Sequence, residues 1–172
     1  MRAIATPRLT LEPQGVEHAE AMFAVLSDPA IYAFENAPPA SLEALRQRFA
    51  ALALRRSPDG RERWLNWVLR LHSGHLIGYV QATLDANGGA FVAYQLGSAH
   101  WGRGLASEAV EGMISELAAT YRVQHLTAVY KRANVRSRRL LERLGFAPAE
   151  GHATAADEDR MTRRLTVSTP TP

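Results

Sequence analysis

Cysteine is absent from the 172 residues of this chain. Its absence excludes a disulfide scaffold, a thiolate metal site and a cysteine nucleophile. Long apolar runs are absent too, since stretches such as residues 49–54 are far too short to span a membrane. The N-terminal residues lack the apolar core of a signal peptide. We therefore expect a cytoplasmic protein that makes no contact with a membrane.

Length and composition are those of an ordinary globular domain. Hydrophobic residues make up 47% of the chain and charged residues 22%, which is enough apolar material for a core without staples. No repeat or low-complexity linker divides the sequence. We expect one domain over residues 1–167, followed by a short flexible tail at 168–172.

Lysine is nearly absent, because 19 of the 20 basic residues are arginine. The net charge is only +3, yet seven basic residues face a single acid between residues 122 and 143. Such a cluster suits a nucleic acid, a phosphorylated ligand or simply water. Aromatic residues are not interleaved with it, so we expect no nucleic-acid partner. The basic residues are Arg122, Lys131, Arg132, Arg136, Arg138, Arg139 and Arg143.

Apolar periodicity predicts a mixed α/β domain. Helical spacing covers residues 16–26, 41–55, 106–117 and 134–144, and strand-like runs cover 8–12, 64–71, 76–84, 90–96, 125–130 and 160–167. The three central runs are joined by short turns, which is typical of an antiparallel meander. We expect one mixed sheet with helices packed on it.

The segment at residues 95–109, Q-L-G-S-A-H-W-G-R-G-L-A-S-E-A, joins a predicted strand to a predicted helix. Glycines there let a ligand approach the backbone, and the helix N-terminus adds free amides and a positive dipole end. Together they favour an anion site that suits a pyrophosphate, although a simple tight turn would give the same pattern. A P-loop is excluded, and the Rossmann fingerprint lacks its third glycine.

A second segment at residues 134–146 reads N-V-R-S-R-R-L-L-E-R-L-G-F. Asn134 is a good N-cap and Gly145 a good residue after the helix C-terminus. By itself the segment is explained as a well-capped helix. The histidines show no ligand spacing, so we expect no metal site.

The two segments, thirty or so residues apart, resemble the GNAT superfamily of acetyl-CoA-dependent N-acetyltransferases. The opening T-P-R-L-T-L-E-P and the run L-I-G-Y-V at 76–80 are similar to its RimJ/RimL-like branch. The resemblance spans roughly residues 6–167. It implies a GNAT-like central sheet, mixed and mostly antiparallel, flanked by about four helices. The activity it implies is acetyl transfer to a protein N-terminal α-amine or a small-molecule amine.

The resemblance also implies where acetyl-CoA binds. The pyrophosphate would lie on the amides of the glycine turn, and the pantetheine arm along the strand end, with the Gln95 and Leu96 amides polarising the thioester carbonyl. The basic cluster, Arg139 included, would offset the cofactor's negative charge. Trp101 stands where the family usually has Arg or Gln. The implied cofactor-binding residues are Gln95, Leu96, Gly97, Trp101, Gly102, Arg103, Gly104, Leu105, Ala106, Ser107, Asn134, Ser137 and Arg139.

For catalysis the family often uses a tyrosine seven residues after the asparagine, where this chain has Leu141. The resemblance implies instead that Ser137 donates a hydrogen bond to the leaving thiolate, unless it is only a helix residue. Glu35 is the candidate base, with a chain of waters as the alternative. Glu108 is expected to be structural, paired with backbone or arginine.

The acceptor is the least defined part of the prediction. Phe34, Trp64 and Trp67 are candidate walls of its pocket, and the acidic run at 157–159 could attract a cation or be a solvated loop. Glu12 is expected to face solvent at a strand edge. The chain is expected to be a monomer or homodimer. A non-catalytic acyl-CoA sensor with the same fold remains open, since Leu141 replaces the tyrosine.

Overall fold

The computed structural model describes residues 1–34, 36–149 and 155–165. Their strands form one eight-stranded sheet in the order β1-β2-β3-β4-β5-β6-β8-β7. The strands are β1 (Ile4–Ala5), β2 (Leu9–Pro13), β3 (Arg63–Leu71), β4 (Leu76–Leu84), β5 (Gly89–Leu96), β6 (His125–Lys131), β7 (Ala147–Pro148) and β8 (Glu158–Arg164). The helices are α1 (Ala19–Leu26), α2 (Leu42–Ala53), α3 (Leu105–Tyr121) and α4 (Val135–Arg143). The predicted mixed, mostly antiparallel sheet with four helices is confirmed.

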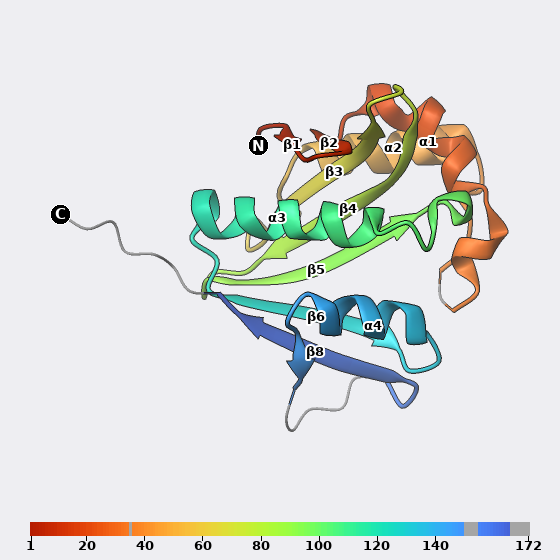
Figure 1. Cartoon of the computed structure of the whole chain (residues 1–172). Helices are drawn as coiled ribbons and strands as arrows, with labels where there is room; N and C mark the ends of the chain where they lie inside the picture. The colour runs from red at the N-terminus through yellow and green to blue at the C-terminus, as the bar shows by residue number, and fades with distance from the viewer. Residues whose placement is uncertain (35, 150–154, 166–172) are drawn as a thin grey trace.

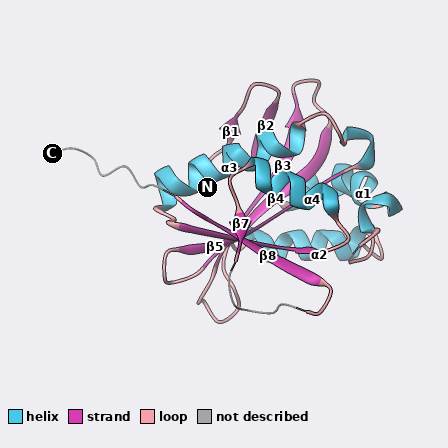
Figure 2. Ribbon diagram, turned by 60° about the horizontal axis from the view of Figure 1, so that its bottom comes forward, coloured by secondary structure: helices cyan, strands magenta, loops and turns pink. Residues whose placement is uncertain are grey.

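The helices cover the two faces of the sheet in pairs, α1 and α2 on one side and α3 and α4 on the other (Figures 1 and 2). Alternation along β3 supplies both sides: Leu65 and Leu69 pack in the larger core beneath α3, whereas Val68 packs with α1 and α2. A strand that is buried on both faces reads as a nearly continuous apolar run, as β3 does. None of the described helices combines the length and apolarity that crossing a membrane requires.

Most predicted elements are present. Strands β3, β4 and β5 form the antiparallel meander, and the Ser41 hydroxyl accepts a hydrogen bond from the Ala44 amide to cap α2. The first predicted helix is divided into a 3-10 turn, Val16–His18, and α1. The two-residue strands β1 and β7 are too short to leave a periodic signal. The predicted tail at 168–172 lies outside the described residues.

The one parallel pair of the sheet positions the site. Strands β5 and β6 are paired only at Gly89–Phe91 and His125–Thr127, and beyond Phe91 they diverge (Figure 1). Because β4 still pairs with β5 as far as Leu96, the opposite edge of β5 is left without a strand partner. This divergence opens the sheet between β5 and β6.

Candidate active site

A cleft of about 330 Å³ occupies the divergence between β5 and β6. One wall is Val92–Leu96 of β5, and the other is formed by β6 and the first turns of α4. The unpaired edge of β5 exposes backbone donors and acceptors to it. A ligand that carries amide groups could complete the interrupted ladder in the manner of an added strand.

The glycine turn at the end of this cleft is built to receive an anion. Gly102 and Gly104 have φ angles of 73° and 76°, in the left-handed region that glycine adopts without strain. Gly104 is the N-cap of α3, and no side chain caps that helix. The first amides of a 17-residue helix are therefore open to a phosphate at the positive end of its dipole.

The turn is held in place by Glu108, as predicted for a structural residue. Its carboxylate accepts hydrogen bonds from the Thr6 hydroxyl and from both the amide and the guanidinium of Arg8. The same guanidinium donates to the Arg103 carbonyl at 2.8 Å. Arg8 thus links the start of β2 to the glycine turn.

Trp101 connects the turn to the strand. Its indole Nε1 donates to the Leu96 carbonyl at 2.9 Å, and the guanidinium of Arg136 lies 3.9 Å from its ring centroid, a cation–π contact. Arg136 comes from α4, so this stack joins the two walls of the cleft. Arg136 lines the cleft, whereas the predicted Arg139 is exposed and does not. Sequence reasoning counted Arg136 in the basic cluster and missed this role.

The N-terminus of α4 places Ser137 in the cleft. Asn134 caps the helix, as predicted, by accepting from the Ser137 amide, and the Ser137 hydroxyl lies 2.8 Å from the hydroxyl of Tyr94. Burial raises the pKa of Tyr94 to about 12, against the opposing effect of the Ser137 hydrogen bond. Tyr94 is therefore neutral near pH 7 and retains a proton to donate. Leu141, at the position where the family often has a tyrosine, is fully buried in the wall of the cleft.

Seven of the predicted residues line this one cleft, and the rest of the predicted turn adjoins them in sequence. Those lining it are Phe34, Gln95, Leu96, Trp101, Ala106, Asn134 and Ser137. Gly97, Gly102, Arg103, Gly104, Leu105 and Ser107 form the adjoining chain.

Two of the residues predicted to line the acceptor pocket lie elsewhere in the structure. Trp67 is completely buried in the core beneath α3, where its Nε1 donates to the Arg2 carbonyl. Trp64 pairs with Thr83 near the other end of the meander. Val68 is the residue of β3 that is level with Gln95, and Trp64 lies about 13 Å along the strand from it, at 3.3 Å per residue. It lines neither pocket beside β5. Glu35 lies outside the described residues.

The acidic run does not offer free charge to a cation. Lys131 pairs with Asp157 and Glu158, at 3.1 and 3.0 Å, and Arg132 pairs with Asp159. Within the described parts of the chain, no three His, Asp or Glu side chains are grouped to hold a metal ion. The predicted alternative of a surface run without a ligand is the one these contacts favour.

A second, smaller pocket of about 40 Å³ adjoins the cleft at Gln95, which lines both. The Gln95 side chain accepts from the Tyr79 hydroxyl and donates to the Ile31 carbonyl, both at 3.1 Å. Gln14, just after β2, and Tyr32 complete its walls together with side chains from α1, α2, β4 and the described residues after Tyr32. No sequence motif indicated this pocket.

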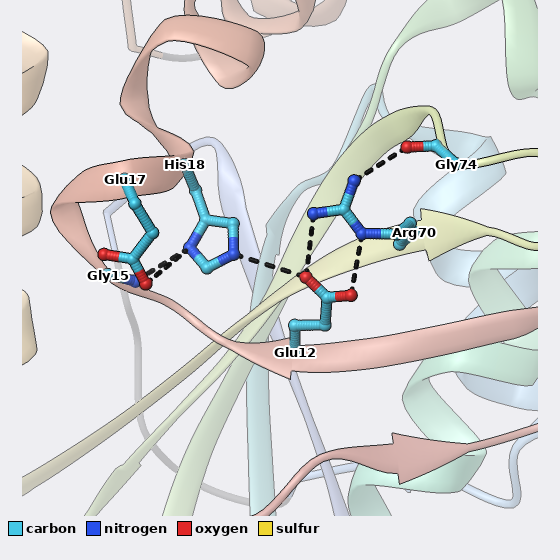
Figure 3. A network of polar contacts seen from close by, with 6 residues as sticks. All are labelled: Glu12, Gly15, Glu17, His18, Arg70 and Gly74. Carbon is cyan, nitrogen blue, oxygen red and sulfur yellow. Dashed lines mark hydrogen bonds and ion pairs between the residues drawn. The ribbon is translucent and has the colours of Figure 1, made fainter.

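Next to Gln14, a polar network corrects the prediction for Glu12 (Figure 3). The Glu12 carboxylate accepts two hydrogen bonds from Arg70, at 2.7 and 2.9 Å, and lies 3.3 Å from the His18 ring. The Arg70 hydrogen bonds lower the pKa of Glu12. At Glu12 β2 pairs with β3 alone, because β1 pairs only with Thr10 and Leu11. The predicted edge position is therefore present, but the carboxylate is 28% exposed and bound to Arg70, so it does not simply face solvent.

Comparison with known proteins agrees with this arrangement. A family model described as an acetyltransferase (GNAT) domain matches residues 8–147. An uncharacterized N-acetyltransferase, p20, from Bacillus licheniformis is 27% identical over 148 residues, covering 85% of this chain and 83% of its own.

Two solved structures share the fold. A ribosomal L7/L12 α-N-protein acetyltransferase, RimL, solved with coenzyme A, superposes with a TM-score of 0.81 at 15% identity, covering 95% of this chain and 98% of its own. A ribosomal-protein-S5-alanine acetyltransferase from Vibrio fischeri also gives 0.81, at 18% identity and 99% coverage of both chains.

Proposed function

The chain belongs to the GNAT family of acetyltransferases, and from that premise we propose that it transfers an acetyl group from acetyl-CoA to a primary amine. The observation that carries the proposal is the coincidence of three features in one cleft. These are an unpaired strand edge, an uncapped helix N-terminus and a pair of partly buried hydroxyls. Each suits a different part of the reaction.

Acetyl-CoA fits the cleft by its chemistry. Its pyrophosphate would lie on the amides of residues 103–107, where no side chain competes for them. Its pantetheine amides would pair with the free edge of β5 between Tyr94 and Gly97. Arg136, above Trp101, would contribute positive charge beside the phosphates. When bound, the cofactor would supply an acetyl thioester; the solved RimL relative holds coenzyme A.

The Leu96 amide would stabilise the charge that develops on the carbonyl oxygen under attack, because it lies on the free edge of β5, whereas the alternation of the β4–β5 ladder turns the Gln95 amide toward β4. Amides fixed in a strand need no reorganisation to do so, which is the source of their effect. The Gln95 side chain is held at both ends, so this part of β5 is rigid.

Ser137 would donate a hydrogen bond to the departing thiolate, with Tyr94 donating in turn to Ser137. A serine alone is a weak acid, but a buried neutral tyrosine 2.8 Å away makes its hydroxyl a better donor, because chains of hydrogen bonds polarise one another. Tyr94 thus compensates for Leu141. Ser137 would touch the reacting sulfur, and Tyr94 would act through it.

The described residues lining the two pockets include no Asp, Glu or His. We therefore propose that the amine reaches the cleft neutral, or loses its proton through water, and Glu35 remains a candidate base. Without a protein base, kcat/KM would rise with pH until the pKa of the amine itself is passed, whereas a catalytic Glu35 would add a second, lower pKa to the profile.

The test is turnover by the purified protein with acetyl-CoA and a panel of amines that includes free amino acids, peptides and polyamines. Release of thiol together with an acetylated amine, identified by mass spectrometry, is the expected result. Tight binding of acetyl-CoA without transfer to any amine would contradict the proposal. That outcome would favour the second candidate, a non-catalytic acyl-CoA sensor, for which Leu141 in place of the family tyrosine is the supporting observation.

A further inference from the structure

The pocket of about 40 Å³ beside Gln95 has the features of a specificity site. It adjoins the proposed acetyl-CoA cleft at Gln95, which lines both. It lies on the α1 and α2 side of the sheet, since Leu26, Leu45 and Phe49 form part of its wall. A volume of this size admits a few atoms, which is a functional group and not a whole side chain of a protein substrate.

Gln14 brings an unsatisfied donor to this pocket. Its side chain is 6% exposed, and among the described residues its Nε2 has no hydrogen-bond partner. A buried polar group left unpaired is costly. The Nε2 atom is itself covered, so an acceptor from outside the protein would pair with it once the Gln14 amide turns toward the pocket.

The backbone around Gln14 is firmly held, which keeps that donor in place. The Gln14 amide donates to the Asn66 carbonyl and the Gly15 amide to His18 Nδ1. Glu12, two residues before Gln14, is fixed by Arg70 and His18 (Figure 3). The network of Glu12, Arg70 and His18 therefore helps to hold the backbone on which Gln14 lies.

Arg48 brings a free positive charge to the same pocket. It lies on α2 and lines the pocket, and it forms no ion pair or hydrogen bond within the described part of the chain. Arg48 is exposed at the rim of the pocket. Burial raises the pKa of Tyr32, and the charge of Arg48 opposes that rise. No described residue lining the pocket carries a negative charge.

We propose that this pocket binds a carboxylate of the acceptor, so that the substrate is a small amine carrying a carboxylate, such as a free amino acid. The proposal rests on the proposed function. A guanidinium and an amide N–H are both donors that a carboxylate accepts, and the bond to Arg48 is charge-assisted. The Tyr32 hydroxyl donates to the Leu26 carbonyl, which leaves its oxygen free only as an acceptor.

The position of the pocket explains why the carboxylate would select the substrate. A carboxylate bound beside Gln95 leaves its amine directed to the acetyl-CoA cleft on the other side of that residue. A protein N-terminus has a peptide carbonyl where a free amino acid has its carboxylate, so it cannot neutralise Arg48.

The test compares reaction products, which makes it independent of turnover. N-acetyl-alanine, N-acetyl-leucine and N-acetyl-methionine are titrated into the full-length protein with saturating CoA, each beside its carboxamide, and binding is measured by calorimetry. The acid is expected to bind about tenfold more tightly than its amide, the size of one charge-assisted hydrogen bond. Equal binding across all three pairs would overturn the proposal.

Two variants and a control identify the groups responsible. Arg48→Gln should abolish the difference between acid and amide, and Gln14→Leu should reduce it. Arg46→Gln, on the same helix but outside the pocket, should leave it unchanged. A parallel turnover assay separates the two levels: acid-selective binding without transfer would sink only the proposed function, and transfer without acid selectivity would sink only this inference.

Discussion

The cleft proposed to bind acetyl-CoA and the pocket proposed to bind a carboxylate, here called the acid pocket, meet at Gln95. They are built in different ways. The cleft presents backbone: the free edge of β5, the glycine turn and the amides that begin α3. The acid pocket presents side chains, brought together from α1, α2, β4, β5 and the segments that follow β2 and α1. Backbone groups would recognise acetyl-CoA, the donor that all members of the family share. Side chains that would recognise the acceptor can be exchanged without disturbing the fold. The comparison explains how one scaffold keeps its donor and varies its acceptor.

The largest expected effect breaks the cleft. Gly104→Glu places a negative charge at the anion site and a side chain at a φ of 76°, so we expect acetyl-CoA affinity to fall by at least 100-fold, or about 2.7 kcal/mol. Gly88→Glu is the matched control, because Gly88 has a φ of 78° in a turn with open space around it. Calorimetry should find Gly88→Glu unchanged in affinity; equal losses in both variants would mean that backbone strain, and not the anion site, is responsible.

Removing the Ser137 hydroxyl should separate chemistry from binding. We expect Ser137→Ala to lower kcat about 100-fold, the lower end of the range for loss of one donor to a developing charge, with acetyl-CoA affinity almost unchanged. Steady-state kinetics and calorimetry measure the two. Ser115→Ala serves as the control, since that hydroxyl bonds only within α3. An unchanged kcat would return Ser137 to a purely helical role.

Tyr94→Phe should have a smaller effect, about fivefold on kcat, because Tyr94 acts through Ser137. In a Ser137→Ala background the same change should cost little more, the non-additivity expected of a coupled pair. Fully additive losses would show that the two hydroxyls act separately.

The same variant has a predicted pH signature. A pKa of about 12 for Tyr94 in the folded protein, against about 10 when unfolded, means that the unfolded chain loses this proton first. Stability should therefore fall as pH rises from 10 to 12. Tyr94→Phe should be less sensitive to alkali over that range in urea unfolding, and parallel curves for both proteins would contradict the burial of this hydroxyl.

The smallest effect concerns the frame of the acid pocket. Glu12→Gln should reduce the free energy of unfolding by about 1 kcal/mol at pH 7, as for a partly exposed ion pair, and leave acetyl-CoA affinity unaltered. Since Arg70 lowers the pKa of Glu12, this contribution is present above the unfolded pKa and is lost as pH falls through the folded one. Denaturant curves of variant and wild type should converge in acid; a constant difference would refute the assignment.

The cleft could be predicted from sequence because its parts are local. A strand end, two glycines and a helix start occur within one segment, and the caps at Ser41 and Asn134 act within three residues. The Tyr94 and Ser137 contact joins residues 43 apart, and it depends on how α4 returns to β5. The acid pocket draws on side chains from several elements and from the segments between them, none of which carries a motif.

The errors have an equally physical cause. Trp64 and Trp67 are three apart in one strand, so they point to opposite faces, and apolar periodicity cannot say which face meets the acceptor. Only the register of β3 against β4 shows that Trp67 faces α3 and that Trp64 lies near the far end. Glu12 does lie where β2 lacks a second strand partner, and the prediction failed on exposure, because the partners of its carboxylate, Arg70 and His18, lie on other elements of the chain.

The most direct test of the account is calorimetric titration of the wild-type protein with acetyl-CoA at low and high ionic strength. Micromolar binding that weakens with salt is the predicted result, because the cofactor's phosphates would meet the α3 N-terminus and Arg136. Absence of binding by a protein shown to be folded would contradict it, and would leave the glycine turn with a structural role alone.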